Sequence, residues 1–319
     1  MAGDTHLRAQ KFPPPVSISA EARKILSVPM PERTIFPDLD DHAAWQKLIE
    51  ERNQAYRSLF AKQVEGGGAL KRDHISGVPV AIMPRPRSMK LPNDYVYMDI
   101  HGGGMIFFGG EYMNWMVEMT ANSVQMEVVS IDYRMPPKYP YPAGLDDCLS
   151  VYLSLAEERG ADKIIVGGSS AGGNLALALM LRLKTEGACL PAGLVLLSPE
   201  VDLTESGDSF QILDGIDILP SFMTVNKLYA ADMALEHPLV SPLFGDFSGE
   251  FPPTFIQSGT RDLFLSNAVR LHRALRRVDA DAELHIWEAM PHGRFPGSPE
   301  ERDVDEEINK FIRKCVVGR

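Results

Sequence analysis

The chain has 319 residues, is 45% hydrophobic and carries a formal net charge of −11 at pH 7, with 43 acidic against 32 basic residues. This length can bury a full core but is short for two independent enzymatic domains, so we expect one domain spanning residues 1–319. The acidic balance, with no basic cluster to override it, disfavours nucleic acids and anionic membrane surfaces and favours a small molecule or another protein as partner.

The cysteines and the hydrophobic stretches exclude further classes. Cys148, Cys189 and Cys315 are far apart and lack zinc or redox spacing, which argues against a disulfide scaffold and a cysteine-based metal site. No export signal and no apolar stretch of about 18 residues or more is found, which predicts the absence of a membrane span. We therefore expect a cytoplasmic protein.

The N-terminal region predicts two helices ahead of any strand. Apolar residues recur at helical spacing over residues 19–26 and about 41–61. The first dozen residues are polar and run into prolines 13–15, so we expect them to be loosely held. Glycines 66–68 mark a break, and short β-type runs begin at residue 69.

From residue 95 onward, strand and helix patterns alternate. The expected strands are residues 95–100, 127–131, 163–166, 194–197, 254–258 and 282–287, and the expected helices are 111–123, 143–156, 175–181, 267–278 and 301–316. This alternation predicts a mostly parallel sheet with helices on both faces, in which ligands bind beyond the carboxyl ends of the strands.

One long insertion interrupts the alternation. Residues 204–236 separate two expected strands and show a helical pattern at about 220–235, and insertions of this length are usually functional. We expect them to form a lid that roofs the site together with the N-terminal helices. The chain would then divide into a cap, about 1–65 plus 204–236, and a catalytic core, about 66–203 plus 237–319.

Ser170 is the candidate nucleophile. In Gly168-Ser169-Ser170-Ala171-Gly172, a β-branched run stops at glycines and a helical run follows, which predicts a strand, a sharp turn and a helix with the serine hydroxyl exposed at the turn. A plain tight turn is the alternative, since short glycine- and serine-rich patterns also arise by chance. A P-loop is excluded because no lysine follows the glycines.

A second glycine-rich turn supplies candidate hydrogen-bond donors. His101-Gly102-Gly103-Gly104 follows a predicted strand directly, and three successive glycines leave backbone N–H groups uncovered and able to face an anion. A simple turn remains the alternative to an oxyanion hole.

A serine nucleophile needs a base and a carboxylate that orients the base. Of the eight histidines, His292 alone directly follows a late strand, which makes it the candidate base. Asp262 follows the preceding strand and gives the chain order serine, aspartate, histidine. Glu200 and Asp202 follow an earlier strand and remain rival acids.

Together these motifs resemble the hormone-sensitive-lipase-like esterases of the α/β-hydrolase superfamily. The resemblance covers about residues 95–295 and is carried by His-Gly-Gly-Gly at 101–104, Asp-Tyr-Arg at 132–134, Tyr-Pro-Tyr-Pro-Ala at 139–143, Asp-Asp at 146–147, the Ser170 motif, Ser-Pro at 198–199, Asp202-Leu203, Asp262 and His292. It implies an α/β-hydrolase fold with an eight-stranded, mostly parallel sheet, helices on both faces and a helical cap.

The resemblance also implies roles for individual residues. Ser170, Asp262 and His292 would be the catalytic triad, and the backbone N–H groups of Gly103, Gly104 and Ala171 would form the oxyanion hole. Such a mechanism needs no metal and no organic cofactor.

Departures from the family pattern fall in the substrate pocket. Ser169 stands where the family often has aspartate, Glu200 where it has tryptophan and Leu263 where it has proline. Ser169 and Glu200 therefore join the apolar residues that we expect to bind substrate, which are Met105, Ile106, Phe107 and Phe222.

The sequence favours a serine carboxylesterase for short-to-medium, apolar acyl esters. Residues 259–266 resemble the lactone-hydrolase branch, so a lactone hydrolase is the alternative. An amidase would use the same triad but needs an extra acid for the amine, and a plant hormone receptor of this fold, which binds without turnover, lacks the histidine. The family commonly dimerises through the C-terminal edge strand, so a homodimer through residues 282–287 is expected.

Overall fold

A computed structural model describes residues 12–30, 32–60, 69–85 and 94–317. Within these ranges eight strands form one sheet in the order β1-β2-β4-β3-β5-β6-β7-β8. The strands are β1 (Lys71–Ile75), β2 (Val78–Met83), β3 (Val96–Ile100), β4 (Glu127–Ile131), β5 (Ile164–Ser169), β6 (Gly193–Leu197), β7 (Thr254–Arg261) and β8 (Ala282–Pro291). The first glycine-rich break and the loosely held N-terminus that the sequence predicts lie outside the described residues.

The sheet is mostly parallel, as predicted. β2 pairs antiparallel with both β1 and β4, and every other pairing is parallel. The parallel strands β3 and β5 are almost wholly buried and rich in β-branched residues, which is the pattern expected of strands covered on both faces. Because β5, β6, β7 and β8 run in the same direction, their carboxyl ends meet at one edge of the sheet.

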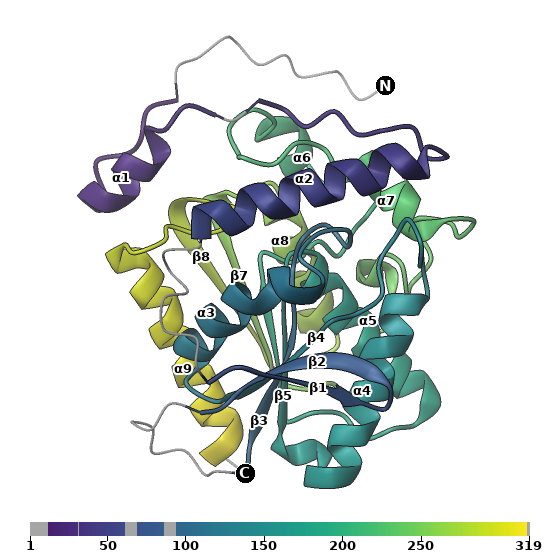
Figure 1. Cartoon of the computed structure of the whole chain (residues 1–319). Coiled ribbons are helices and arrows are strands. Elements are labelled where there is room, and N and C mark those ends of the chain that lie inside the picture. The colour runs from purple at the N-terminus through teal and green to yellow at the C-terminus, as the bar shows by residue number, and fades with distance from the viewer. Residues whose placement is uncertain (1–11, 31, 61–68, 86–93, 318–319) are drawn as a thin grey trace, which may run out of the picture.

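Helices cover both faces of the sheet (Figure 1). They are α1 (Ala20–Leu26), α2 (His42–Phe60), α3 (Asn114–Val124), α4 (Ala143–Arg159), α5 (Ala171–Glu186), α6 (Ser209–Ile212), α7 (Met223–Ala230), α8 (Leu265–Arg277) and α9 (Pro299–Val317). One hydrophobic cluster joins the sheet to α4, α5 and α8, and a second joins its other face to α3 and α9. None of the described helices is both long enough and apolar enough to cross a membrane.

Most elements lie where the sequence predicts them, with differences at their ends. The helix expected at 111–123 begins with a 3₁₀ turn, Gly110–Met113, before α3. The helix expected at 220–235 is shorter, since α7 ends at Ala230 and Ala231 takes a positive φ of 52°. β7 and β8 extend further than expected, to Arg261 and Pro291, so they reach the residues just before Asp262 and His292.

The N-terminal helices and the insertion lie together over one end of the sheet. Figure 1 shows α2 running across that end beside α6 and α7. Trp45 of α2 is fully buried against Ile106, Val225 and Leu228, the last two from α7. Burying a side chain of this size stabilises the contact by about 2–3 kcal/mol.

A link between the first and last helices holds the N-terminal segment. Ser19, the N-cap of α1, donates its backbone N–H and its hydroxyl to the two carboxylate oxygens of Glu300, at 2.6 and 2.7 Å.

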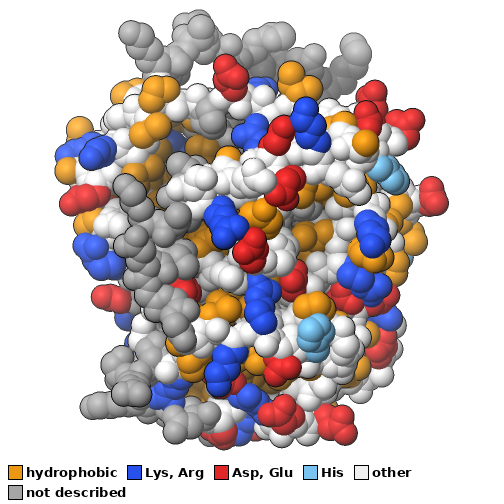
Figure 2. All heavy atoms as spheres, in the orientation of Figure 1, with side chains coloured by type: hydrophobic (Ala, Val, Ile, Leu, Met, Phe, Trp, Pro, Cys, Tyr) orange, Lys and Arg blue, Asp and Glu red, His pale blue; other side chains and the backbone are white. Residues whose placement is uncertain are grey.

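On the face drawn in Figure 2, basic and acidic side chains are interspersed, and no single-sign patch is visible there.

Candidate active site

Ser170 lies on a strained turn between β5 and α5. Its φ of 56° and ψ of −122° are outside the regions that a residue with a side chain ordinarily adopts. Backbone hydrogen bonds hold the turn: the Ser170 N–H donates to the Leu197 carbonyl (2.9 Å), and the Ser170 carbonyl accepts from Gly173 (2.9 Å) and Glu200 (3.1 Å). The strand, sharp turn and helix are as predicted.

The glycines around Ser170 are required by the close approach of neighbouring backbones. A Cβ at Gly172 would lie 1.9 Å from the carbonyl oxygen of Ile100, and one at Gly168 would lie 2.2 Å from the carbonyl oxygen of Gly172. No side chain fits at either distance. The motif around Ser170 is therefore dictated by packing as well as by chemistry.

Asp262 and His292 lie side by side beyond neighbouring strands. Asp262 follows β7, His292 follows β8, and His292 Nδ1 is 3.3 Å from Asp262 Oδ1. The Asp262 side chain is fully buried, whereas that of His292 is 13% exposed. Ser170 leaves β5 at the same edge of the sheet, since these strands are parallel.

The Asp262 carboxylate is held by further donors. Its Oδ2 accepts from the Ser258 hydroxyl (2.6 Å), and its Oδ1 accepts from the Phe264 N–H (3.0 Å). Burial would raise the pKa of Asp262, but hydrogen bonds from His292, Ser258 and Ser198 keep it below the usual value. A carboxylate ionised in this way can orient the imidazole and stabilise its positive charge.

Neither rival acid is hydrogen-bonded to His292 among the described residues. The Asp202 carboxylate accepts from Thr204 and Ser206 of its own loop and from Arg270 of α8 at 2.5 Å, so it joins that loop to α8. Glu200 is only 2% exposed, and its Oε1 has no hydrogen-bond partner in the described part of the chain. Burial and the nearby Glu205 raise the pKa of Glu200 to about 8, so it is mostly neutral at pH 7.

Asp217, on the insertion, was not predicted from the sequence. It is 1% exposed, accepts the backbone N–H groups of Ile218 (2.6 Å) and His292 (3.3 Å), and also accepts the N–H of Leu263. Burial raises its pKa to about 6, although the charge of His292 opposes the rise. One carboxylate thus ties the insertion to the loops that carry Asp262 and His292.

The surrounding carboxylates favour the protonated form of His292. Burial would lower the pKa of the imidazole, but the hydrogen bond and charge of Asp262, with the charge of Asp217, raise it above its usual value. The site is therefore built to stabilise a positive charge on His292, as a base that accepts a proton requires.

The glycine-rich turn after β3 lies against Ser170. A Cβ at Gly102 would be 3.3 Å from the Ser170 Cβ. Gly103 and Gly104 have φ values of 113° and 58°, which favour glycine, and within the described ranges their N–H groups donate to no protein atom. Ala171 begins α5, so its N–H is one of the first four without an intrahelical acceptor.

His101, the first residue of this turn, holds it in place through buried contacts. Its ring is buried, stacks on Tyr133 with centroids 4.4 Å apart, and places Nδ1 2.7 Å from the Gly102 carbonyl oxygen. The Tyr133 hydroxyl donates to the His101 carbonyl at 2.9 Å. Burial lowers the pKa of His101, so we assign it to the support of the turn.

The apolar residues predicted to bind substrate divide into two groups. Met105 packs in the main core, and Ile106 packs against α2 and α7 in the Trp45 cluster. Phe107 and Phe222 are only partly buried at the edge of that cluster, and the Phe222 ring would be 2.9 Å from a Cβ at Gly104. Phe222 is thus the apolar side chain placed directly at the glycine turn.

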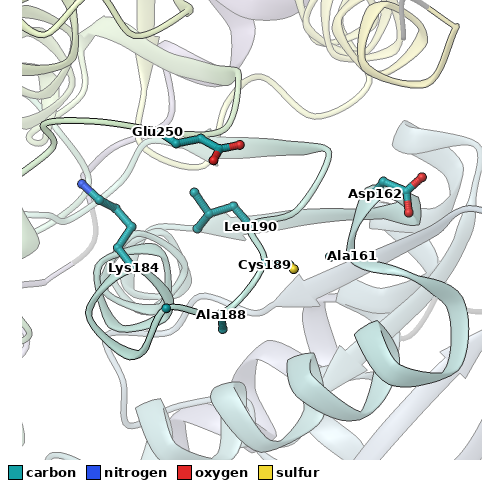
Figure 3. Close-up of a pocket in the computed structure, with 8 residues that line it drawn as sticks. Ala161, Asp162, Lys184, Ala188, Cys189, Leu190 and Glu250 are labelled. Atoms are coloured by element: carbon teal, nitrogen blue, oxygen red, sulfur yellow. The ribbon is translucent and has the colours of Figure 1, made fainter.

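A cavity of about 620 Å³ lies elsewhere on the molecule and does not involve these residues. Figure 3 shows Asp162, Lys184, Cys189 and Glu250 among its lining. They come from the segments that precede β5, β6 and β7, at the opposite end of those strands from Ser170. No group of three or more histidine, cysteine, aspartate or glutamate residues suited to a metal ion occurs in the described part of the chain.

Comparison with known proteins agrees with this geometry. The family model described as "alpha/beta hydrolase fold" matches residues 97–295. An esterase of Acinetobacter venetianus is 36% identical over 198 residues, which span 60% of this chain and 64% of that protein. The carboxylesterase NlhH of Mycobacterium tuberculosis is 31% identical over 236 residues, or 69% of this chain and 72% of that protein.

The chain belongs to the hormone-sensitive-lipase-like esterases of the α/β-hydrolase superfamily. Solved structures agree: esterase E25 superposes on this esterase with a TM-score of 0.87 at 33% identity, covering 97% of this chain and 98% of that one. EstE7, a hormone-sensitive-lipase homologue from a metagenome library, gives a TM-score of 0.75 at 30% identity, covering 89% of this chain and all of that one.

Two residues of this esterase site, Asp217 and Ser258, were not predicted from the sequence. Asp217 lies between Ile216 and Ile218, and an acidic residue between apolar side chains is fully buried only where its carboxylate is paired. Ser258 lies four residues before Asp262, but only the bend at the end of β7 brings its hydroxyl to the carboxylate.

Proposed function

We propose that this protein is a serine carboxylesterase in which Ser170 is the nucleophile, His292 the general base and Asp262 the orienting acid. The observation that carries the proposal is the His292–Asp262 contact at 3.3 Å, at the same edge of the sheet as a serine with a φ of 56° on a strand-to-helix turn. The name of the carboxylesterase relative from M. tuberculosis supports the same reaction class.

The first half of the reaction acylates the enzyme. His292 takes the Ser170 hydroxyl proton as the serine oxygen attacks the ester carbonyl carbon. The carbonyl π electrons move to oxygen, and the resulting oxyanion faces the N–H groups of Gly103, Gly104 and Ala171. When the oxyanion collapses, the carbon–oxygen bond to the alcohol breaks, and His292 gives its proton to the departing alkoxide.

The second half releases the acid. A water molecule gives a proton to His292 and attacks the acyl-enzyme carbonyl, and the second oxyanion uses the same three N–H groups. Collapse breaks the bond to Ser170, which takes the proton back from His292. Asp262 remains ionised throughout and stabilises the imidazolium that forms in each half.

Replacement of the nucleophile tests the proposal. Ser170→Ala should retain the fold, since the hydroxyl makes no essential packing contact, and should lower kcat for p-nitrophenyl butyrate by at least about 1,000-fold. Ser248→Ala is the control, because it removes an exposed hydroxyl in the segment before β7, at the opposite end of the sheet, and should keep turnover within a few-fold. Activity of Ser170→Ala within tenfold of the parent would refute the nucleophile.

For the substrate, we propose short-to-medium, apolar acyl esters. The cap contributes Phe222 against the glycine turn and Phe107 belongs to the same cluster, so the groups near Ser170 on this side are apolar. Burying each CH₂ of an acyl chain contributes about 0.8 kcal/mol, whereas an unpaired charge in the same place costs several kcal/mol.

We further propose that α1, α2 and the insertion act as the cap over a core formed by the rest of the chain.

A substrate panel separates this proposal from its alternatives. Soluble p-nitrophenyl esters from two to about twelve carbons, compared by kcat/KM with plain and alkylated lactones, should give a maximum at or below about eight carbons. A preference for long-chain triglyceride would contradict the capped pocket. Lactones that surpass every linear ester would favour a lactone hydrolase, to which residues 259–266 bear a resemblance.

A further inference from the structure

A second cavity lies directly behind the loops of the candidate active site. Its volume is about 390 Å³, which is within the usual range for small-molecule sites. Its lining is apolar except for one arginine, and consists of Phe12, Ile25, Leu26, Val28, Pro29, Met30, Gly215, Ile216, Ile218, Arg261 and Pro291.

The lining residues alternate along the chain with residues of the candidate active site. Arg261 precedes Asp262, Pro291 precedes His292, and Ile216 and Ile218 flank Asp217. Arg261 and Pro291 are the last residues of β7 and β8. Because successive side chains of a strand point to opposite sides, the cavity lies on the other side of these strand ends from Asp262 and His292. It is therefore distinct from the pocket that Phe222 and the glycine turn define.

Arg261 is the chemically informative residue of this cavity. It is 8% exposed, and its guanidinium lies 4.6 Å from the centroid of the Phe12 ring and donates one hydrogen bond, to the Pro13 carbonyl at 2.7 Å. No carboxylate of the described residues lies within ion-pair distance of it. A guanidinium has five N–H donors, so most of its capacity remains for a ligand.

We propose that this cavity binds an amphiphilic monocarboxylate, such as a medium-chain fatty acid, with the carboxylate on Arg261 and the chain along the apolar wall. The planar guanidinium matches a carboxylate through two parallel hydrogen bonds, and the wall offers only hydrocarbon to the tail. A neutral apolar molecule would leave the arginine donors unpaired, and a small anion would leave the wall exposed to water. The site goes beyond the proposed function and does not depend on it.

Burial also favours a negative ligand beside this side chain. The cost of removing the guanidinium from water lowers the pKa of Arg261, although Glu288 opposes the shift at a distance. A carboxylate bound to the guanidinium would compensate this cost of desolvation.

Calorimetric titration of the full chain with octanoate at pH 7.5 tests the proposal. Octanoate should bind in the millimolar range or tighter, while octanol and butyrate should bind at least tenfold more weakly, since each lacks one half of the required chemistry. Arg261→Gln should weaken octanoate binding at least tenfold, and Arg302→Gln, which removes an exposed arginine, should leave it unchanged.

Two more variants test whether the apolar wall, and not the catalytic pocket, holds the octanoate chain. Val28→Glu places a negative charge at an exposed wall position and should also weaken octanoate at least tenfold, which covers the case in which Arg261→Gln does not fold. Phe222→Ala changes the catalytic pocket alone and should leave octanoate binding intact. Equal binding by Arg261→Gln and the parent, or loss of binding in Phe222→Ala only, would overturn the proposal whether or not the protein is an esterase.

Discussion

The backbone N–H of His292 points at Oδ1 of Asp217, 3.3 Å away, so a carboxylate from the insertion fixes the loop that carries the proposed base. The same carboxylate accepts the N–H of Leu263, the residue after the proposed acid. One buried side chain therefore attaches the insertion to the loops that carry the proposed acid and the proposed base, and the proposed cap is mechanically connected to both.

Replacing Asp217 should affect both stability and the pH dependence of catalysis. In the parent protein the backbone N–H groups share two carboxylate oxygens, whereas Asp217→Asn leaves them a single amide oxygen. Each buried N–H group that loses its acceptor costs about 1–3 kcal/mol of stability. Because the Asp217 charge raises the pKa of His292, its removal should lower that pKa and extend the acidic limb of the kcat/KM profile to lower pH. Urea denaturation and pH–rate profiles measure the two effects.

The control for this variant is Asp208→Asn, an exposed carboxylate in the same insertion. It should change neither the free energy of unfolding nor the profile. An unmoved acidic limb in Asp217→Asn would show that the carboxylate does not act on His292 electrostatically.

The buried Glu200 should make stability fall as pH rises. Its folded-state pKa of about 8 is above the ordinary value, so between about pH 4.5 and 8 the folded protein holds a proton that the unfolded chain has lost. The free energy of unfolding should then fall with pH by up to about 1.4 kcal/mol per unit from this group, and level off above pH 8. Urea denaturation of the parent and Glu200→Gln from pH 5 to 9 should show a shallower fall in the variant; parallel curves would exclude this account.

The choice of acid is tested by activity. Asp262→Asn removes the charge at 3.3 Å from His292 Nδ1 and should lower kcat by about 1,000-fold or more, since the wrong tautomer of the imidazole is favoured. Glu200→Gln, which keeps a side chain of the same shape, should lower kcat by far less. If Glu200→Gln is the more damaging of the two, Glu200 carries the role of the acid.

Gly104→Ala should lower kcat by tenfold or more. The methyl group would lie 2.9 Å from Phe222 Cε1 at a φ of 58°, so both the ring and the N–H assigned to the oxyanion must move. Gly110→Ala is a matched control because it has a φ of 63° with nothing within 4 Å, and should only lose about 1–2 kcal/mol of stability. Phe222→Leu in the Gly104→Ala background should recover part of the turnover.

We expect the protein to form a homodimer through its edge strand β8. β8 lies at the end of the sheet and Ile286 is 38% exposed on it, which leaves unpaired backbone groups and an apolar side chain for a second copy. Light scattering should give about twice the 35.3 kDa of one chain, and Ile286→Lys should shift the mass toward the monomer. A parent protein of about 35 kDa at every concentration would contradict this expectation.

The sequence predicts the elements of the sheet well because their signals are local. The run at residues 127–131 becomes β4 with the same bounds, since buried β-branched residues specify a strand without outside help. Ser170, Asp262 and His292 could be chosen because each directly follows a strand, and parallel strands end at one edge.

Contacts that join distant segments could not be predicted in this way. Asp217 accepts hydrogen bonds from Leu263 and His292, which follow it in the sequence by 46 and 75 positions. These bonds depend on how the insertion folds back over the sheet. The lone charge of Arg261 in its cavity likewise depends on Phe12 and on residues 215–218, and no spacing in the sequence relates them. The apolar pattern of the insertion fits a packed cap and a pocket wall equally well.

The bond from Ser19 to Glu300 also has a consequence for synthesis. Its partners are 281 positions apart, so during translation the N-terminal helix leaves the ribosome long before the glutamate that anchors it exists. β8 and His292 are likewise made well after Ser170. A nascent chain therefore has no complete candidate site until His292 has emerged, and the N-terminal segment should be more accessible to chaperones and proteases before Glu300 is made than after it.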